Sequence, residues 1–492
     1  MKSSAPHPTH PQAEQLNLEL GSSADLSGAQ FGSAAARVAA SIPKIALDPR
    51  RRYPALQSSY SHRKTMEDCP RQSYEYSRRE KGRDPEADPR DREIFLRTTL
   101  KSSPEILGHA VHEAAAYALS TLCGEKLGEN QYAPSRIVTL DELLDRASRW
   151  YIRIMGLSAG ASRLHFAADP ERFPLLVEDV LEMNRRPLEV ERVGVVAMHK
   201  WRSELWSDIN TCITNFYTLF FAPRVQGLTD GGFLSQATGG FAQLKPGRYP
   251  AGDFLTIEGW RESEFSSDSV GAHARSNEWP HFLLPIVHTI RDHTGSLVRR
   301  GFDAKNLCIL DFAYAEPERD SWHEGRHSPG RIVICDWKTN TLDPETNRPW
   351  GGKARQHLQQ LSEYAVYMLE LFPELTPQDI ILRLYYLRGE GISAEDRVEE
   401  YSAASIDSSP GMAVTRERIR LAIQDRANRF FDPVTGQTEL SLWPYAENKS
   451  TCTYCKVAGI CDGAPPETRA AMNFDIISMR PSGTDKPVDE GI

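Results

Sequence analysis

Two short apolar runs, each with an aspartate near its end, hold the residues best placed to do chemistry. The first run, Leu307–Ala313, contains Asp311. The second, Ile332–Thr339, contains Asp336 and Lys338. Apolar runs bounded by polar, Pro- and Gly-bearing loops predict buried strands. Side chains at positions i and i+2 of a strand share a face, so Asp336 and Lys338 are predicted to point the same way.

Two carboxylates and a lysine at one place suggest a divalent-cation site with a fixed positive charge beside it. A carboxylate next to apolar surface needs a counter-charge, and a metal ion supplies one. Metal-assisted hydrolysis of a phosphodiester requires this combination. The alternative is that Asp311 merely ends a strand while Asp336 and Lys338 form an ordinary ion pair. The D-x-K spacing alone does not separate these two interpretations.

Helical segments on either side of these runs would add further polar side chains. Ser103–Tyr117 begins with a cap residue followed by proline, and its apolar stripe leaves His109 and His112 side by side. A histidine in this setting is either a ligand or a hydrogen-bonded structural residue, depending on what it faces. Ala354–Phe372 keeps a 3.6-residue apolar stripe and carries two polar residues, Gln360 and Tyr364, one turn apart on a neighbouring face.

A further apolar run, Asp379–Leu387, predicts another buried strand. The resulting order is helix, strand, strand, helix, strand. That order predicts an α/β core with a mixed sheet.

Three cysteines near the C-terminal end have the spacing of a metal or cluster site. Two residues separate Cys452 from Cys455, and Cys461 follows after five more, so a turn brings the thiolates together. A tetrahedral site or a cubane cluster needs a fourth ligand, for which Cys69 is the best candidate. The other cysteines fall in predicted strands or helices, where we expect buried, inert thiols: Cys123, Cys212, Cys308 and Cys335.

Together these residues resemble the PD-(D/E)XK nuclease superfamily. The likeness is to its RecB-like branch with a split four-cysteine iron–sulfur motif, which includes AddB-type and CRISPR-adaptation exonucleases. Gly108-x-x-x-His112 resembles the histidine helix of the family, and Asp311 resembles its second-motif acid. Asp336-Trp337-Lys338-Thr339 resembles the D-x-K signature.

Two more motifs extend the resemblance. Gln360-x-x-x-Tyr364 resembles the Q-x-x-x-Y helix of this branch. The likeness covers roughly residues 57–122 and 300–465, and the stretch between the histidine helix and Asp311 is long for this fold. The split four-cysteine pattern is matched by Cys69, Cys452, Cys455 and Cys461.

The resemblance implies an enzyme that hydrolyses DNA phosphodiester bonds, expected to be an exonuclease or end-processing nuclease in repair, recombination or phage defence. It implies a restriction-endonuclease-like mixed sheet core flanked by helices, with a large, mostly helical insertion. It also implies Mg²⁺ or Mn²⁺ at the nuclease site and a [4Fe-4S] cluster, with zinc as the alternative, at the cysteines. The implied metal ligands are His112, Asp311 and Asp336, with His109 as a rival to His112. The implied catalytic residues are Asp311, Asp336, Lys338, Gln360 and Tyr364.

Two other functions stay open on the sequence. One is a catalytically silent member that binds DNA or scaffolds a helicase, and the other is a zinc protein with an incidental D-x-K. The sequence has no G-x-x-x-x-G-K-[ST] phosphate loop. A helicase or ATPase would therefore be a separate subunit.

The composition sets broad limits. The chain has 492 residues, 40% of them hydrophobic, and a net charge of −9 from 58 basic and 67 acidic residues. Contacts with nucleic acid must therefore come from local patches. No apolar run approaches the ~20 residues that span a bilayer, and Met1–His7 precedes no apolar core typical of a secretory signal. We therefore expect a cytoplasmic protein with reduced cysteines and no membrane partner.

We expect five segments along the chain. They are a disordered leader at 1–55, the N-terminal part of a nuclease domain at 56–123, a helical insertion at 124–295, the nuclease core with the C-terminal cysteines at 296–465, and a flexible tail at 466–492.

Overall fold

A five-stranded mixed sheet forms the centre of the protein in the computed structural model. The described residues are 56–123, 137–159, 165–170, 172–180, 200–223, 254–257, 281–291, 294–316, 331–343, 346, 348–349, 353–371, 375–389, 392–406, 412–432, 437–438, 440–473 and 476. The expected leader at 1–55 lies outside them. The strands of the sheet are β2 (Phe254–Ile257), β5 (Phe312–Glu316), β6 (Arg331–Lys338), β7 (Ile380–Tyr386) and β8 (Val398–Ser402).

The order and direction of these strands confirm the predicted mixed sheet. They lie in the order β2-β5-β6-β7-β8, and every neighbouring pair is antiparallel except β6 and β7. Parallel neighbours need a crossover connection. The helix α12 (Lys353–Leu371), which stands between β6 and β7 in the chain, provides it.

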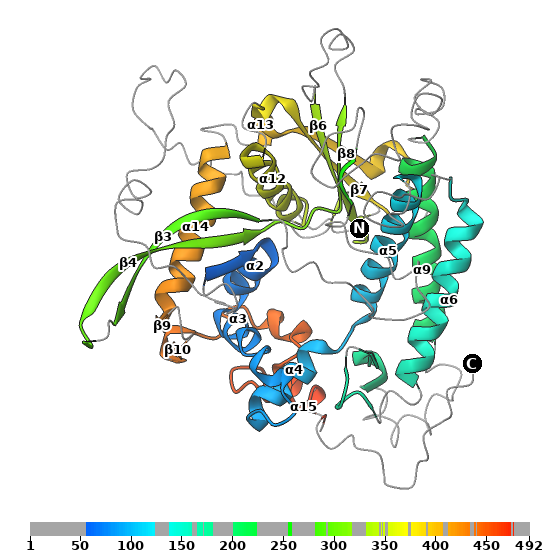
Figure 1. Cartoon of the computed structure of the whole chain (residues 1–492). Helices are drawn as coiled ribbons and strands as arrows, with labels where there is room; N and C mark the ends of the chain where they lie inside the picture. The colour runs from blue at the N-terminus through cyan, green and yellow to red at the C-terminus, as the bar shows by residue number, and fades with distance from the viewer. Residues whose placement is uncertain are drawn as a thin grey trace, which may run out of the picture.

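Helices cover both faces of the sheet (Figure 1). One face carries α5 (Ser103–Cys123), α6 (Leu140–Ala159) and α9 (Lys200–Phe216), and the other carries α12 and α14 (Met412–Arg429). Successive side chains of a strand point to opposite faces, so β6 contributes to both layers. Val333, Cys335 and Trp337 lie in the first hydrophobic core, and Ile332 and Ile334 lie in the second.

Aromatic rings join the first helical layer to the sheet. The π-helical turn η4 (Tyr217–Phe221) continues α9 and presents Phe220, whose ring lies 4.9 Å from that of Trp337 and 5.5 Å from that of Phe312. Phe216 also meets Trp337 edge-on at 5.2 Å. Offset and edge-to-face ring pairs of this kind add to the burial of apolar area. The helices α6 and α9 therefore share one core with the sheet.

The expected helical insertion at 124–295 contains both helices and strands among its described residues. Its helices α6 and α9 are a layer of the sandwich, because their apolar faces are buried against α5 and the sheet. Its C-terminal part also contains β2 and a second strand, β3 (His281–Arg291), both of which pair with later strands. Strand pairing over this distance leaves no local signal in the sequence.

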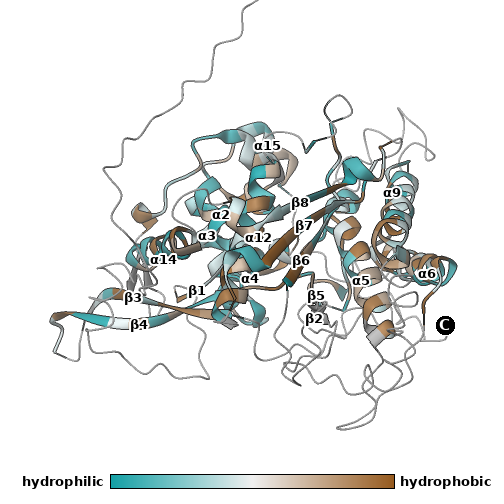
Figure 2. Ribbon diagram, turned by 90° about the horizontal axis from the view of Figure 1, so that it is seen from above, coloured by the Kyte–Doolittle hydropathy of each residue, from teal (hydrophilic) through white to brown (hydrophobic). Residues whose placement is uncertain are grey.

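The strand β3 pairs with β4 (Leu297–Leu307) in an antiparallel hairpin that extends away from the rest of the molecule (Figures 1 and 2). The short strand β1 (Gln57–Ser59) lies parallel to the end of β4 and completes a three-stranded sheet. The turn contains Gly295, whose φ of 82° favours glycine. The expected core boundary at 296 falls within this hairpin.

The expected flexible tail at 466–492 also begins with ordered chain. The helix α15 (Pro466–Ala471) is followed by the buried side chains of Met472 and Ile476. The carbonyl of Met472 accepts a hydrogen bond from the fully buried Arg97 at 2.9 Å. These long-range contacts hold residues that their own composition would leave exposed. The rest of the expected tail, 474–475 and 477–492, lies outside the described residues.

Among the described residues, no helix is long and apolar enough to cross a membrane. Several short elements complete this part of the chain. They are α2 (Tyr60–Asp68), α3 (Pro70–Ser77), η2 (Lys81–Arg83), α4 (Pro89–Thr99), η10 (Pro377–Asp379), η11 (Glu395–Arg397), α13 (Ala403–Ile406), β9 (Phe430–Asp432), β10 (Gln437–Thr438), η12 (Leu440–Leu442), η13 (Lys449–Tyr454) and η14 (Ala458–Ile460).

A buried ion pair anchors the N-terminal segment to the sandwich. Arg63 of α2 forms an ion pair with Glu363 of α12, and both side chains are more than 90% buried. The other guanidinium nitrogen of Arg63 donates to Asn306 at 2.5 Å and to Ser58 at 3.2 Å. A buried ion pair of this kind is stable because its remaining donors and acceptors are also satisfied.

Replacing Arg63 with alanine should lower the free energy of unfolding by about 3–5 kcal/mol, because Glu363 would keep a buried charge without a partner. Its neighbour Lys64 provides the control, since it forms a more exposed i,i+4 pair with Asp68. Lys64→Ala should cost about 0.5 kcal/mol or less. Urea unfolding of both variants measures the difference. Equal midpoints would show that Arg63 does not anchor the segment.

Candidate active site and cysteine cavity

The strand β6 delivers Asp336 and Lys338 to the end of the sheet. Both side chains lie on the same face, as the i, i+2 spacing predicted, and Asp336 Oδ2 stands 2.5 Å from Lys338 Nζ. Asp336 is only 1% exposed. The strand holds this carboxylate in an apolar environment because Asp336 shares the face of β6 with Ile334, which is buried in the second core.

Asp311 stands beside these residues, although not in a strand as predicted. The run expected to be one strand is interrupted, since β4 ends at Leu307 and β5 begins at Phe312. The chain bends here because β4 and β5 belong to different sheets. The bend lets Asp311 Oδ2 accept a hydrogen bond from the backbone N–H of Trp337 at 2.8 Å, which fixes this carboxylate at the end of β6.

Burial and the neighbouring charges change the pKa of Asp336. Burial raises the pKa of Asp336 to about 7; the Lys338 ammonium opposes this shift, whereas Asp311 increases it. A dry site with two carboxylates and one ammonium carries an excess negative charge when both acids ionise. Such a site is stabilised by a proton or by a further cation.

Of the two histidines on α5, only His112 faces the carboxylates. Its Nδ1 lies 3.6 Å from Asp311 Oδ1. His109 Nε2 instead lies 2.9 Å from Oε1 of the fully buried Glu113, and its ring packs edge-on against Trp150. Gly108 lies near the end of β6, since a Cβ added there would lie 3.9 Å from the hydroxyl of Thr339.

The helix α12 supplies a hydrogen-bonded chain that ends on Lys338. Lys338 Nζ donates to Gln360 Oε1 at 3.0 Å, and Gln360 Nε2 donates to the Tyr364 hydroxyl at 2.7 Å. Tyr364 is buried, and burial together with Asp336 and Asp311 keeps its pKa well above the usual value. The hydroxyl therefore stays protonated, and Gln360 holds the ammonium of Lys338 toward the two acids.

Two residues near this centre, His357 and Tyr386, were not predicted from the sequence. His357 lies one turn before Gln360 on α12, and its Nδ1 is 3.4 Å from the hydroxyl of Tyr386, the β7 residue paired with Lys338. Burial lowers the pKa of His357 to about 4, and the charge of Lys338 contributes. The sequence did contain a signal for His357, because the helical spacing of positions 357, 360 and 364 places all three side chains on neighbouring faces of one helix.

The four cysteines chosen from the sequence line one cavity, although Cys69 lies in the N-terminal part of the chain. Cys69 separates α2 from α3, and its Sγ accepts a hydrogen bond from the backbone of Gln72 at 3.4 Å. The other three lie in or next to η13 and η14, and the wall is completed by polar residues of α3, such as Arg71 and Glu75, and by apolar residues such as Val457. Burial, with a contribution from the three neighbouring thiols, raises the pKa of Cys455 to about 12. The lining cysteines are Cys69, Cys452, Cys455 and Cys461.

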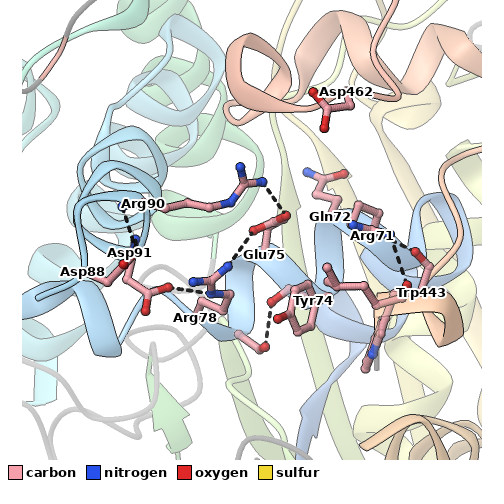
Figure 3. Close-up of polar contacts among 12 residues, drawn as sticks. Arg71, Gln72, Tyr74, Glu75, Arg78, Asp88, Arg90, Asp91, Trp443 and Asp462 are labelled. Atoms are coloured by element: carbon pink, nitrogen blue, oxygen red, sulfur yellow. Dashed lines mark hydrogen bonds and ion pairs between the residues drawn. The ribbon is translucent and has the colours of Figure 1, made fainter. Parts of the chain in front are cut away.

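Arginines on α3 and α4 hold the elements around this cavity together (Figure 3). Arg71 donates to the carbonyl of Trp443 at 2.9 Å, and its guanidinium lies 4.6 Å from the ring centre of Tyr445. Glu75 forms ion pairs with Arg78 at 3.9 Å and with Arg90 at 3.0 Å. The cavity is thus enclosed by contacts between the N-terminal and C-terminal segments that do not depend on the thiols.

The remaining cysteines lie apart from this cavity. Cys212, Cys308 and Cys335 are buried, and burial raises the pKa of Cys212 to about 12 and that of Cys308 still higher. Cys308 follows β4 and is not inside a strand, contrary to the prediction. The side chain of Cys123 lies outside the described residues.

Both groups have the right donor atoms for metal binding. Two carboxylates and an imidazole suit Mg²⁺ or Mn²⁺, and four thiols suit an iron–sulfur cluster or zinc. Within the part of the chain that the structure describes, however, no group of three or more His, Cys, Asp or Glu side chains is placed closely enough to hold an ion. The two groups are therefore clusters of suitable donors and not preformed cages.

Comparison with known proteins agrees with this geometry over part of the chain. Residues 324–462 match the family model described as the PD-(D/E)XK nuclease superfamily, a class of phosphodiester hydrolases. Residues 324–462 are therefore similar to the nuclease domain of this superfamily. The matched stretch includes Asp336, Lys338 and Gln360, whereas Asp311 and His112 precede it. No curated protein matches the chain.

The raised pKa of Asp336 predicts a pH dependence of stability in metal-free protein. Its ordinary pKa of 3.8 rises to about 7 in the folded state, so the folded state binds this proton more tightly than the unfolded state. Stability should therefore fall, relative to Asp336→Asn, as pH rises from about 4 to about 7, by up to about 4 kcal/mol. Above pH 7 the difference should be constant.

Urea unfolding in EDTA between pH 4 and 8.5 measures this difference, and any pH-independent effect of the substitution cancels. Parallel stability curves for the wild type and the variant would contradict the raised pKa.

Proposed function

We propose that this protein is a metal-dependent DNA nuclease that acts on DNA ends. The observation that carries the proposal is the convergence of Asp311, Asp336 and Lys338 at one end of the sheet, with Gln360 bonded to Lys338. Three of these four residues fall inside the stretch that matches the nuclease superfamily. The action on ends, in DNA repair, recombination or phage defence, rests on the resemblance described above.

The two carboxylates and His112 are the proposed ligands of the metal. When bound, Mg²⁺ or Mn²⁺ would polarise the scissile phosphate and lower the pKa of a water molecule. The backbone N–H of Trp337 holds one oxygen of Asp311, which leaves the other facing His112. Asp336, on the neighbouring strand, completes the negative charge that attracts the cation.

Lys338 is the proposed source of positive charge for the transition state. Its ammonium is fixed between Asp336 and Gln360, so little reorganisation is needed as charge builds on the phosphate. The same ammonium can orient the attacking water. Gln360 is itself held by Tyr364, and we assign both residues the role of positioning Lys338 or the DNA backbone.

We also propose that Cys69, Cys452, Cys455 and Cys461 bind a structural [4Fe-4S] cluster, with zinc as the alternative. The support is that the four thiols line one cavity and that three of them raise the pKa of the fourth, as close thiols do. Cluster binding would close the loop between Cys69 and the C-terminal turns, which adds stability because loop closure in the unfolded chain is costly.

Asp336→Ala and Lys338→Ala should each lower the rate of DNA cleavage by at least about 100-fold, because each removes a charge that serves the transition state. Folding and DNA affinity should change little. The control Lys200→Ala removes an exposed cation on α9 and should keep full activity. Cleavage of end-labelled and circular DNA with Mg²⁺ or Mn²⁺ tests the variants and, through the two substrates, the action on ends.

Unchanged turnover in either variant would remove the nuclease assignment of these residues. Wild-type protein that binds DNA but cuts neither substrate would instead be a silent binding or scaffold protein.

Cys69→Ser should lose iron and brown colour together and should melt several degrees lower, because cluster binding is linked to folding. Cys212→Ala is the control, since Cys212 is buried in α9 away from the cavity. It should keep its iron and lose only ordinary packing stability. Iron analysis, visible absorption and thermal unfolding measure these effects.

Full iron and colour in Cys69→Ser would mean that the fourth ligand lies elsewhere. A colourless wild type that contains zinc would select the zinc alternative.

A further inference from the structure

The hairpin formed by β3 and β4 has no part in the site described so far. Its base is held firmly, since the side chain of Gln424 on α14 accepts from the backbone N–H of Val287 at 2.9 Å and donates to its carbonyl at 2.5 Å. Beyond Val287 the two strands continue to the turn at Gly295, and the views in Figures 1 and 2 both show them extending outward. We call residues 288–300 the arm.

The hairpin is cationic in a protein that is acidic overall. Residues 281–307 contain four Lys or Arg and two Asp, whereas the whole chain has a net charge of −9. Arg299 is exposed and Arg300 is half-buried, and among the described residues neither forms an ion pair. The hydrogen bond from Arg300 to the carbonyl of Arg299, at 3.3 Å, leaves both positive charges uncompensated, and such charges suit an anionic ligand.

The arm also presents apolar surface. Leu297 is 64% exposed near the turn, and it shares the outward face of β4 with Arg299 because the two are separated by two positions. The opposite face of the hairpin is buried lower down, where Phe302 and Ala304 lie in the second core. One exposed face thus combines an apolar side chain with a cation.

The dimensions of the hairpin fit a DNA duplex. A two-stranded ribbon is one of the two elements that the major groove admits, and apolar side chains there contact the thymine methyl group. β4 has 11 residues, which at ~3.3 Å per residue span about 35 Å, close to one turn of B-DNA. Leu307, at the base of β4, lies four positions before Asp311 in the chain. Leu297, at the outer end of β4, is therefore about one turn of B-DNA away from Asp311.

We infer that the arm binds double-stranded DNA about one helical turn from the nuclease centre, with phosphates at Arg299 and Arg300 and a groove or base edge at Leu297. This inference rests on the proposed nuclease function and names duplex DNA as the substrate class. The arm holds the duplex while the end of the DNA reaches Asp311 and Asp336.

Binding without metal isolates the arm from cleavage. In EDTA, the double variant Arg299→Ala/Arg300→Ala should bind a 30-bp duplex about tenfold more weakly than the wild type. The slope of log affinity against log salt should become less negative by about 2, or about 0.9 for each lost phosphate contact. Leu297→Ser should weaken binding without changing the slope.

The control Arg149→Ala/Lys200→Ala also removes two exposed cations, from α6 and α9. It should leave affinity and slope unchanged. With duplexes of about 8 bp, which are too short to reach the arm, wild type and arm variant should bind equally. Fluorescence anisotropy with labelled DNA measures all of these quantities.

Equal slopes for wild type and arm variant on the 30-bp duplex would overturn the inference, as would an equal loss in the control or a wild type that binds no duplex. Cleavage separates this failure from failure of the proposed function. An arm variant that cuts short single strands at the wild-type rate leaves the nuclease intact, whereas a wild type that cuts no DNA refutes the nuclease itself.

Discussion

Two carboxylates that are buried side by side must share a proton or be neutralised by a cation, and this constraint governs the centre of the molecule. Lys338 offsets only one of the two charges, and burial together with the charge of Asp311 raises the pKa of Asp336 to about 7. A divalent cation would remove the remaining excess. The apolar strands that make the site costly to charge are also what would make a bound cation effective, because charges interact more strongly in a dry environment.

The site depends on segments that are far apart in the chain. His112 comes from the N-terminal part, Asp311 from the bend between two sheets, and Gln360 from the helix that connects β6 to β7. Arg63 and Glu363 join the first of these segments to the last through a buried ion pair. The cavity lined by four thiols joins the same N-terminal segment to the C-terminal turns. Both connections tie α2 and the start of α3 to later parts of the chain.

The sequence predicted what depends on local spacing. The shared face of Asp336 and Lys338, the helix that carries Gln360 and the mixed sheet all follow from periods of two and 3.6 residues. It did not predict the bend at Asp311, the pairing of β3 with β4, or the choice of His112 over His109 by contact, which depend on long-range packing. The preference for His112 came from the family resemblance alone. The contact between Phe220, in the turn that continues α9, and Trp337 was also not predicted. A run of aromatic residues indicates burial but does not identify the residues against which the rings pack.

Metal binding to the carboxylate pair tests the central claim most directly. Titration with Mn²⁺, followed by electron paramagnetic resonance at pH 7, should show a site in the wild type that is lost in Asp311→Asn and in Asp336→Asn. Binding should release protons in the wild type, because the metal displaces the proton that Asp336 retains at this pH. The same number of bound ions with the same affinity in the wild type and in Asp336→Asn would contradict the account.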